Sequence, residues 1–109
     1  MTRKEGIAEM TSAIERVKEF IERIKAIPGY RRDKVCDSYI GKANQFILTY
    51  SNHVKQYKDM SDEEFSSLDL RNIFRFFDSN FKSLELTCRT LVARGPQHIM
   101  GSPTKKGPY

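Results

Sequence analysis

Residues 70–91 read LRNIFRFFDSNFKSLELTCRTL, and their hydrophobic side chains recur in alternating steps of three and four residues. Residues three and four apart lie on one face of an α-helix, so this spacing predicts an amphipathic helix with a continuous apolar face. The members of that face are Leu70, Phe74, Phe77, Phe81, Leu84, Cys88 and Leu91. Such a helix must pack against other helices to bury its apolar side.

Two earlier stretches of similar length repeat this spacing. The first contains Ile7, Met10, Ile14, Val17, Ile21 and Ile24. The second contains Cys36, Ile40, Ala43, Ile47, Tyr50, Val54 and Tyr57. Three amphipathic helices joined by short connections pack in alternating directions. The sequence therefore predicts an all-α, antiparallel up-down-up three-helix bundle, with a short extra helical turn before the third helix.

Local signals place the ends of the first two helices. Thr2 and Glu5 have the spacing of a capping box, in which each side chain bonds a backbone N–H of the other residue. Pro28 cannot continue a helix, and the glycine after it favours a turn. We therefore expect helices over residues 3–26 and 32–58.

The segment before the third helix allows two interpretations. Ser61 and Glu64 have the spacing of a second capping box. It opens either a short turn at 61–67, which folds Phe65 over the end of the bundle before Asp69 caps the third helix, or one continuous helix up to residue 94. We expect one domain over residues 1–94 and a disordered basic tail over 95–109, because the tail is rich in Gly, Pro, Ser and Lys.

Residues that lie equally far along the sequence from the turn joining two helices are expected to share a layer of the core. These layers pair Tyr50 with Phe74 and place the small Ala43 opposite Phe81, as dense packing requires. Cys36 and Cys88 fall in one layer, where they are either reduced core thiols or a redox-sensitive pair.

Composition and charge limit the class of protein. The chain has 109 residues, 30% of them charged, and a net charge of +5. Its apolar stretches are too short for a membrane span, and the N-terminal residues lack the hydrophobic region of a signal peptide. We therefore expect a cytoplasmic protein, or a nuclear one if the source is eukaryotic.

No cluster of residues carries a chemical signature. The chain has no CxxC motif, and its two histidines, His53 and His98, have no partner at a catalytic or metal-ligand spacing. We therefore predict no catalytic residue, no metal and no cofactor, and we do not expect an enzyme. The alternative is a small enzyme with a polar pocket around Tyr39, His53 or Tyr57.

The outer face of the second helix is the best candidate for binding a protein. Between Lys42 and Lys55 the sequence contains no charge. Four residues are expected on the side opposite the core, where one leucine would be exposed and one glycine would let another backbone approach: Gly41, Gln45, Leu48 and Asn52. The partner would be another protein or a second copy of the chain. An ordinary polar face is the alternative.

Basic residues gather toward one end of the bundle and in the tail. They are Arg31, Arg32, Lys34, Lys42, Lys105 and Lys106. Together they could bind the phosphates of nucleic acid or of an anionic membrane, or they could simply form a basic surface. In the tail, Ser102 precedes a proline and lies near a lysine, as in a proline-directed phosphorylation site.

The third helix also resembles a known family. Its aromatic pair, Phe76 and Phe77, precedes Lys82, Leu84 and Glu85. This pattern, after two amphipathic helices, resembles the helical C-terminal part of the bacterial 5-bromo-4-chloroindolyl phosphate hydrolysis (XpaC-like) family over about residues 14–94. The chain departs from the family pattern by having Asp-Ser-Asn after the aromatic pair, where the family has a Leu-Pro-Thr-like break. The resemblance implies a bacterial helical module, and it carries no catalytic residues with it.

Overall fold

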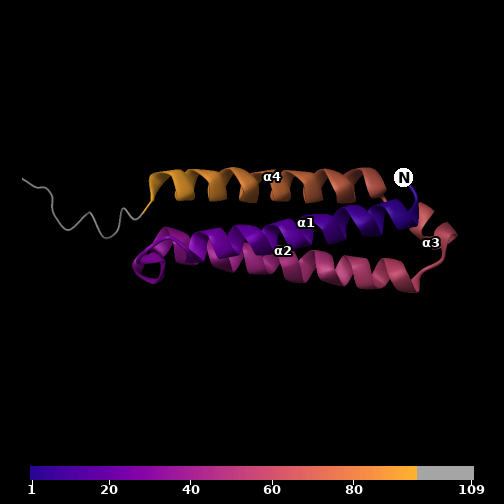
Figure 1. Ribbon diagram of the computed structural model, residues 1–109. Helices are drawn as coiled ribbons and strands as arrows, with labels where there is room; N and C mark the ends of the chain where they lie inside the picture. Colours follow the sequence, from indigo (N-terminus) through magenta and orange to yellow (C-terminus); the bar gives the residue numbers. More distant parts are fainter. Residues whose placement is uncertain (96–109) are drawn as a thin grey trace, which may run out of the picture.

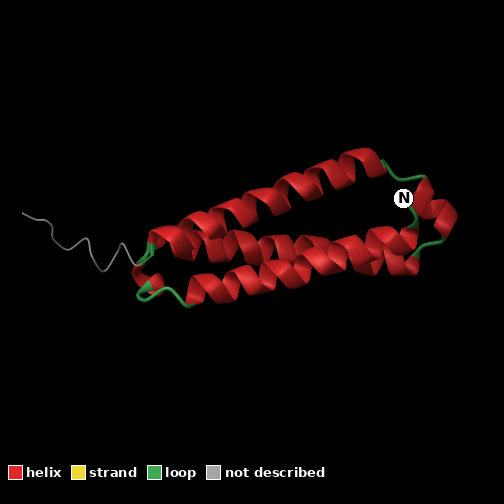
Figure 2. Cartoon of the chain, turned by 45° about the horizontal axis from the view of Figure 1, so that its top comes forward, coloured by secondary structure: helices red, strands yellow, loops and turns green. Residues whose placement is uncertain are grey.

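A computed structural model describes residues 1–95 of the chain. Within this range helices joined by short loops are the only regular secondary structure, and there is no strand (Figure 2). The α-helices are α1 (Arg3–Lys25), α2 (Lys34–Asp59), α3 (Asp62–Ser66) and α4 (Leu70–Arg94), and a 3₁₀ helix, η1 (Tyr30–Arg32), precedes α2. All of the predicted core positions thus lie on α1, α2 or α4.

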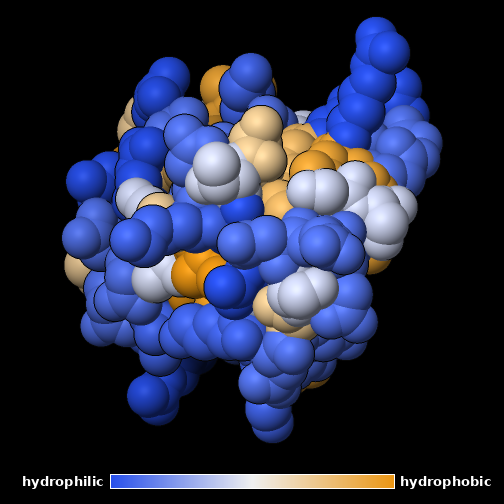
Figure 3. All heavy atoms as spheres, turned by 90° about the vertical axis from the view of Figure 1, so that its right-hand side faces the viewer, coloured by the Kyte–Doolittle hydropathy of each residue, from blue (hydrophilic) through white to orange (hydrophobic). Residues whose placement is uncertain are grey.

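The three long helices lie side by side, and α3 covers the end at which the N-terminus also lies (Figure 1). Helix α1 packs against both α2 and α4 more extensively than those two pack against each other. The contact between α2 and α4 is therefore the least extensive of the three between the long helices. At the α3 end of the bundle, hydrophilic side chains cover most of the surface, with hydrophobic atoms visible between them (Figure 3).

The structure confirms the predicted capping residues. Thr2 and Ser61 each accept a backbone N–H at 3.1 Å, and the glutamate three residues later accepts the cap's own N–H at 2.8 Å. Asp69 caps α4 separately, so the alternative of one continuous helix over 62–94 is wrong. Helix α2 starts two residues later than expected, because η1 occupies 30–32 and Asp33 is the N-cap.

The hydrophobic core is wider than the predicted apolar faces. Phe20, Tyr39 and Phe46 are at most 5% exposed, although none of them belongs to the predicted sets. A helix that contacts two others buries side chains on both flanks of its main apolar face. Several predicted members, in turn, are only partly buried: Ile7, Ile40, Ile47, Leu70 and Phe81.

The alignment of α4 against α2 differs from the predicted layers by about one helical turn. Tyr50 lies beside Phe77, with ring centroids 5.0 Å apart, whereas the predicted layer paired it with Phe74. Phe81 lies beside Phe20 and Phe46, at 5.8 and 6.3 Å between centroids. The predicted layers assumed equal distances from each turn, and the separate helix α3 breaks that symmetry.

The two glycines inside helices have opposite surroundings, which gives a matched prediction. A Cβ at Gly6 would lie 2.9 Å from the ring of Phe65, whereas one at Gly41 would meet nothing within 4 Å. Gly41→Ala should raise the free energy of unfolding by about 0.5–1 kcal/mol through helix propensity. Gly6→Ala should raise the free energy of unfolding by less, or should lower it, because the Phe65 ring must move. Urea titration measures both; an equal gain at the two sites would contradict this packing.

Candidate functional site

The four residues of the predicted partner-binding face all lie exposed on α2. Gly41, Gln45, Leu48 and Asn52 follow one another in steps of three and four, so they share one side of the helix. Leu48 is 57% exposed, and the surroundings of Gly41 are open. The structure thus leaves this face accessible to another helix.

The predicted basic residues are divided between two elements. Arg31 and Arg32 are exposed on η1, and the Arg31 guanidinium donates to the Tyr30 hydroxyl at 3.2 Å. Lys34 and Lys42 are exposed on α2 and line the same hollow beside α4. The remaining predicted members, Lys105 and Lys106, lie outside the described residues, as do His98 and Ser102.

Two adjoining hollows lie between α2 and α4 and form what we term the α2–α4 groove. One has a volume of about 290 Å³ and is lined by Phe46 and Tyr50 of α2, with Asn80 of α4 opposite. The other, of about 270 Å³, is lined by Val35 and Tyr39. Both hollows share three lining residues, Lys42, Ser83 and Leu84, so they form one continuous depression along the least extensive helix contact.

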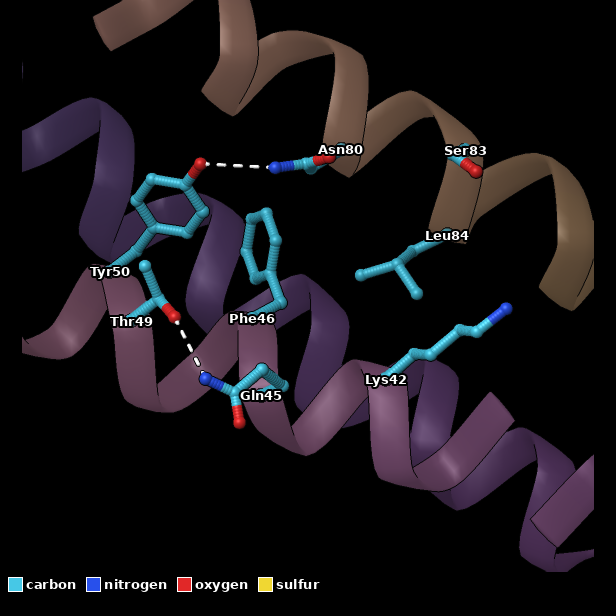
Figure 4. Close-up of a pocket in the computed structure, with 8 residues that line it drawn as sticks. All are labelled: Lys42, Gln45, Phe46, Thr49, Tyr50, Asn80, Ser83 and Leu84. Atoms are coloured by element: carbon cyan, nitrogen blue, oxygen red, sulfur yellow. Dashed lines mark hydrogen bonds between the residues drawn. The ribbon is translucent and has the colours of Figure 1, made fainter. Parts of the chain in front are cut away.

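The α2–α4 groove has an apolar floor and polar sides. Phe46 and Tyr50 point from α2 toward α4, and Leu84 points back toward α2 (Figure 4). The amide of Asn80 donates to the Tyr50 hydroxyl at 3.2 Å, across the groove from α4 to α2 (Figure 4). At the other end, the Tyr39 hydroxyl donates to the Leu84 carbonyl oxygen at 2.8 Å. These bonds fix the side chains of the floor in place.

Sequence reasoning missed this groove, although a signal was present. On α4, Phe76, Asn80, Ser83 and Thr87 follow one another in steps of four, three and four and carry no charge. The test that singled out α2, an uncharged stretch of sequence, does not find this face, because Asp78, Lys82 and Glu85 lie between its members; a search of each helix face would have found it. Which faces meet across two helices depends on their rotation, which periodicity within one helix leaves open.

The two cysteines are not bonded to each other. Both are free and buried, and burial raises the pKa of each thiol. The Cys88 thiol faces the Phe20 carbonyl oxygen at 3.7 Å, while Cys36 lies 3.7 Å from the guanidinium of Arg94. The two thiols thus have different neighbours, in keeping with the shifted alignment of α4. Both match the expectation of reduced core thiols, and the alternative of a redox-sensitive pair stays a prediction.

The residues considered for a small enzyme are mostly enclosed. Tyr39 and Tyr57 are at most 3% exposed. His53 is partly buried, with its Nδ1 2.8 Å from the Thr49 carbonyl oxygen and its ring beside that of Tyr50, 5.2 Å between centroids. Within residues 1–95, no three His, Cys, Asp or Glu side chains are grouped so that they could hold a metal ion.

Comparisons of the chain with protein-family models, with curated proteins and with solved structures found no match. The resemblance to the XpaC-like family therefore stays a prediction. In the part of the chain that the structure describes, no helix has an apolar stretch long enough to cross a lipid bilayer.

Proposed function

We propose that the three long helices form an antiparallel up-down-up bundle that works as a non-enzymatic interaction module in the cytoplasm. In this proposal the chain binds a helix of another protein, or of a second copy of itself, on the exposed side of α2. The partner-binding residues are those of the uncharged face: Gly41, Gln45, Leu48 and Asn52.

The observation that carries the proposal is the exposed, uncharged side of α2. No charged residue occurs between Lys42 and Lys55, so a partner can cover this length without burying an unpaired charge. Leu48, 57% exposed, supplies an apolar anchor at its centre. Two helical turns before Leu48, Gly41 leaves room for a partner's backbone. An interface core is typically depleted of charge in this way.

Leu48→Glu tests the proposal. A carboxylate at the centre of an apolar contact would have to be buried without a partner, so binding should weaken by about tenfold or more. The measurements are the mass of the purified protein by light scattering and the set of proteins that the immobilised chain retains. Leu86→Glu is the matched control, because Leu86 is also a helical, exposed leucine, 62% exposed on α4. If both variants keep the wild-type mass and partners, the proposal is wrong.

A second candidate function rests on the basic residues. Lys34 and Lys42 line one hollow, and Arg31 and Arg32 are exposed on the neighbouring η1. This surface could bind the phosphates of nucleic acid or of an anionic membrane. Its affinity would then fall steeply with salt, whereas an apolar contact around Leu48 would change little.

A further inference from the structure

We propose that the α2–α4 groove is a docking site for an acidic amphipathic helix of a partner protein, which would lie along α2 and α4 as a fourth helix. This inference rests on the proposed function as an interaction module and assigns it a second surface, which adjoins the face around Leu48 at Gln45. The partner is defined by its chemistry: an apolar stripe flanked by carboxylates.

The charge around the groove selects an acidic partner. Among the described residues that line the two hollows, the charged ones are Lys34 and Lys42, and none is a carboxylate. A helix with glutamate or aspartate beside its apolar stripe would place those groups next to the two lysines. A helix flanked by lysine or arginine would meet like charge, which is costly at an interface.

The shape of the groove fits a helix. It follows α2 from Lys34 to Tyr50, a length of about 24 Å at a rise of 1.5 Å per residue, which corresponds to about four helical turns. Its sides carry small polar residues, among them Ser38, Ser83 and Thr87. Small side chains allow helix axes to approach within the 8–10 Å typical of packed helices.

Apolar side chains stand exposed near both ends of the groove. Val35, which lines one end, is 52% exposed. Phe76 lies one helical turn before Asn80 on α4 and is 60% exposed. A helix in the groove would cover these two side chains together with the Phe46 and Leu84 floor. Clustered apolar anchors with a polar rim are the usual basis of helix-in-groove binding.

The test uses a synthetic probe with three heptads of leucine at positions a and d, glutamate at e and g, and alanine elsewhere. Its matched counterpart carries lysine in place of glutamate. Fluorescence anisotropy with labelled peptides gives Kd for the full-length chain, and amide chemical shifts of the ¹⁵N-labelled protein locate the binding site. We expect the acidic peptide to bind about tenfold or more tightly than the basic one, with shifts concentrated on α2 and α4 around Lys42 and Ser83.

Two variants test whether the acidic peptide binds in the α2–α4 groove. Ser83→Glu places a carboxylate on the groove rim and should weaken binding of the acidic peptide by about tenfold or more. Lys42→Glu leaves one positive and one negative charge on the groove lining, so it should abolish the preference for the acidic peptide. Both positions are exposed, and a thermal melt of each variant verifies that it folds. Ser12→Glu is the matched control, because Ser12 is exposed on α1 and lines a hollow against α4 that shares no residue with the groove, so this change should leave the affinity unchanged.

Several results would overturn the inference. They are absence of binding by the acidic peptide, equal affinity for the two peptides, or loss of binding in Leu48→Glu but not in Ser83→Glu. Binding of phosphatidylserine vesicles without binding of the acidic peptide would likewise overturn it, in favour of an anionic surface. The proposed function is tested separately, by the mass of Leu48→Glu and by the set of proteins that it retains. Either proposal can therefore be wrong without the other.

Discussion

Replacing Phe77 by alanine is expected to lower the free energy of unfolding by about 3–5 kcal/mol. The Phe77 ring is only 2% exposed, and its centroid lies 5.8, 5.0 and 5.7 Å from those of Phe46, Tyr50 and Phe74. Truncation removes this cluster's central ring and leaves a cavity between α2 and α4. Because small domains are stable by only about 5–15 kcal/mol, a loss of this size would be visible at once in a urea titration.

The neighbouring aromatic residue provides the matched control. Phe76 is 60% exposed, so Phe76→Ala should change the free energy of unfolding by no more than about 0.5 kcal/mol. The two variants remove the same atoms from adjacent positions of one helix and differ only in burial. Equal effects at Phe76 and Phe77 would mean that α4 presents a different face to the core.

Asp33→Ala is expected to lower the free energy of unfolding by about 2–5 kcal/mol, because Asp33 has two structural roles. Its carboxylate accepts the Val35 N–H at 2.9 Å as the N-cap of α2, which is worth about 0.5–2 kcal/mol. It also forms an ion pair with Arg94 near the end of α4, where the Asp33 side chain is only 10% exposed. A hydrogen bond to a charged group adds about 1.5–3 kcal/mol.

A second aspartate separates these two roles. Asp69 is the N-cap of α4, and the Asn72 amide and backbone N–H are the groups that donate to it. Asp69→Ala should therefore cost only the capping contribution, about 0.5–2 kcal/mol. Thermal or urea unfolding of both variants gives the difference. If Asp69→Ala destabilises as much as Asp33→Ala, the ion pair with Arg94 adds nothing.

The contribution of Asp33 should also depend on pH. Burial by itself would raise the pKa of its carboxyl, but the backbone N–H groups of Cys36 and Val35 and the Arg94 guanidinium outweigh burial and hold the pKa below the ordinary value of 3.8. A group whose pKa is lowered by folding contributes stability above its unfolded pKa and loses it as the pH falls through the folded pKa. The difference between wild type and Asp33→Ala should thus be constant near neutral pH and shrink below about pH 3.8.

Hydrophobic periodicity and capping residues were sufficient to predict the helices. The capping boxes at Thr2 and Ser61 lie where the sequence placed them, and the predicted fold of Phe65 over the end of the molecule is matched by its burial at 1% exposure. These signals are local, because a capping residue acts on the first turn of its own helix. They fix where a helix starts and which of its faces is apolar.

Contacts between helices could not be predicted in the same way. The partnership of Cys36 with Arg94, in place of Cys88, depends on how far α4 is displaced along α2. That displacement is set by α3 and its connections, whose geometry has no signature in the periodicity of the long helices. The α2–α4 groove was missed for the same reason, since it exists only through the mutual rotation of two helices.

The salt dependence of partner binding distinguishes an apolar contact around Leu48 from binding through the basic residues. The immobilised chain would be exposed to its partners at low and at high salt, and the amount retained would be quantified. We expect the part of the retention that Leu48→Glu abolishes to be nearly equal at both, because an apolar contact around Leu48 does not depend on long-range charge attraction. If that part falls steeply at high salt, the partner is bound through the basic residues and not through an apolar contact at Leu48.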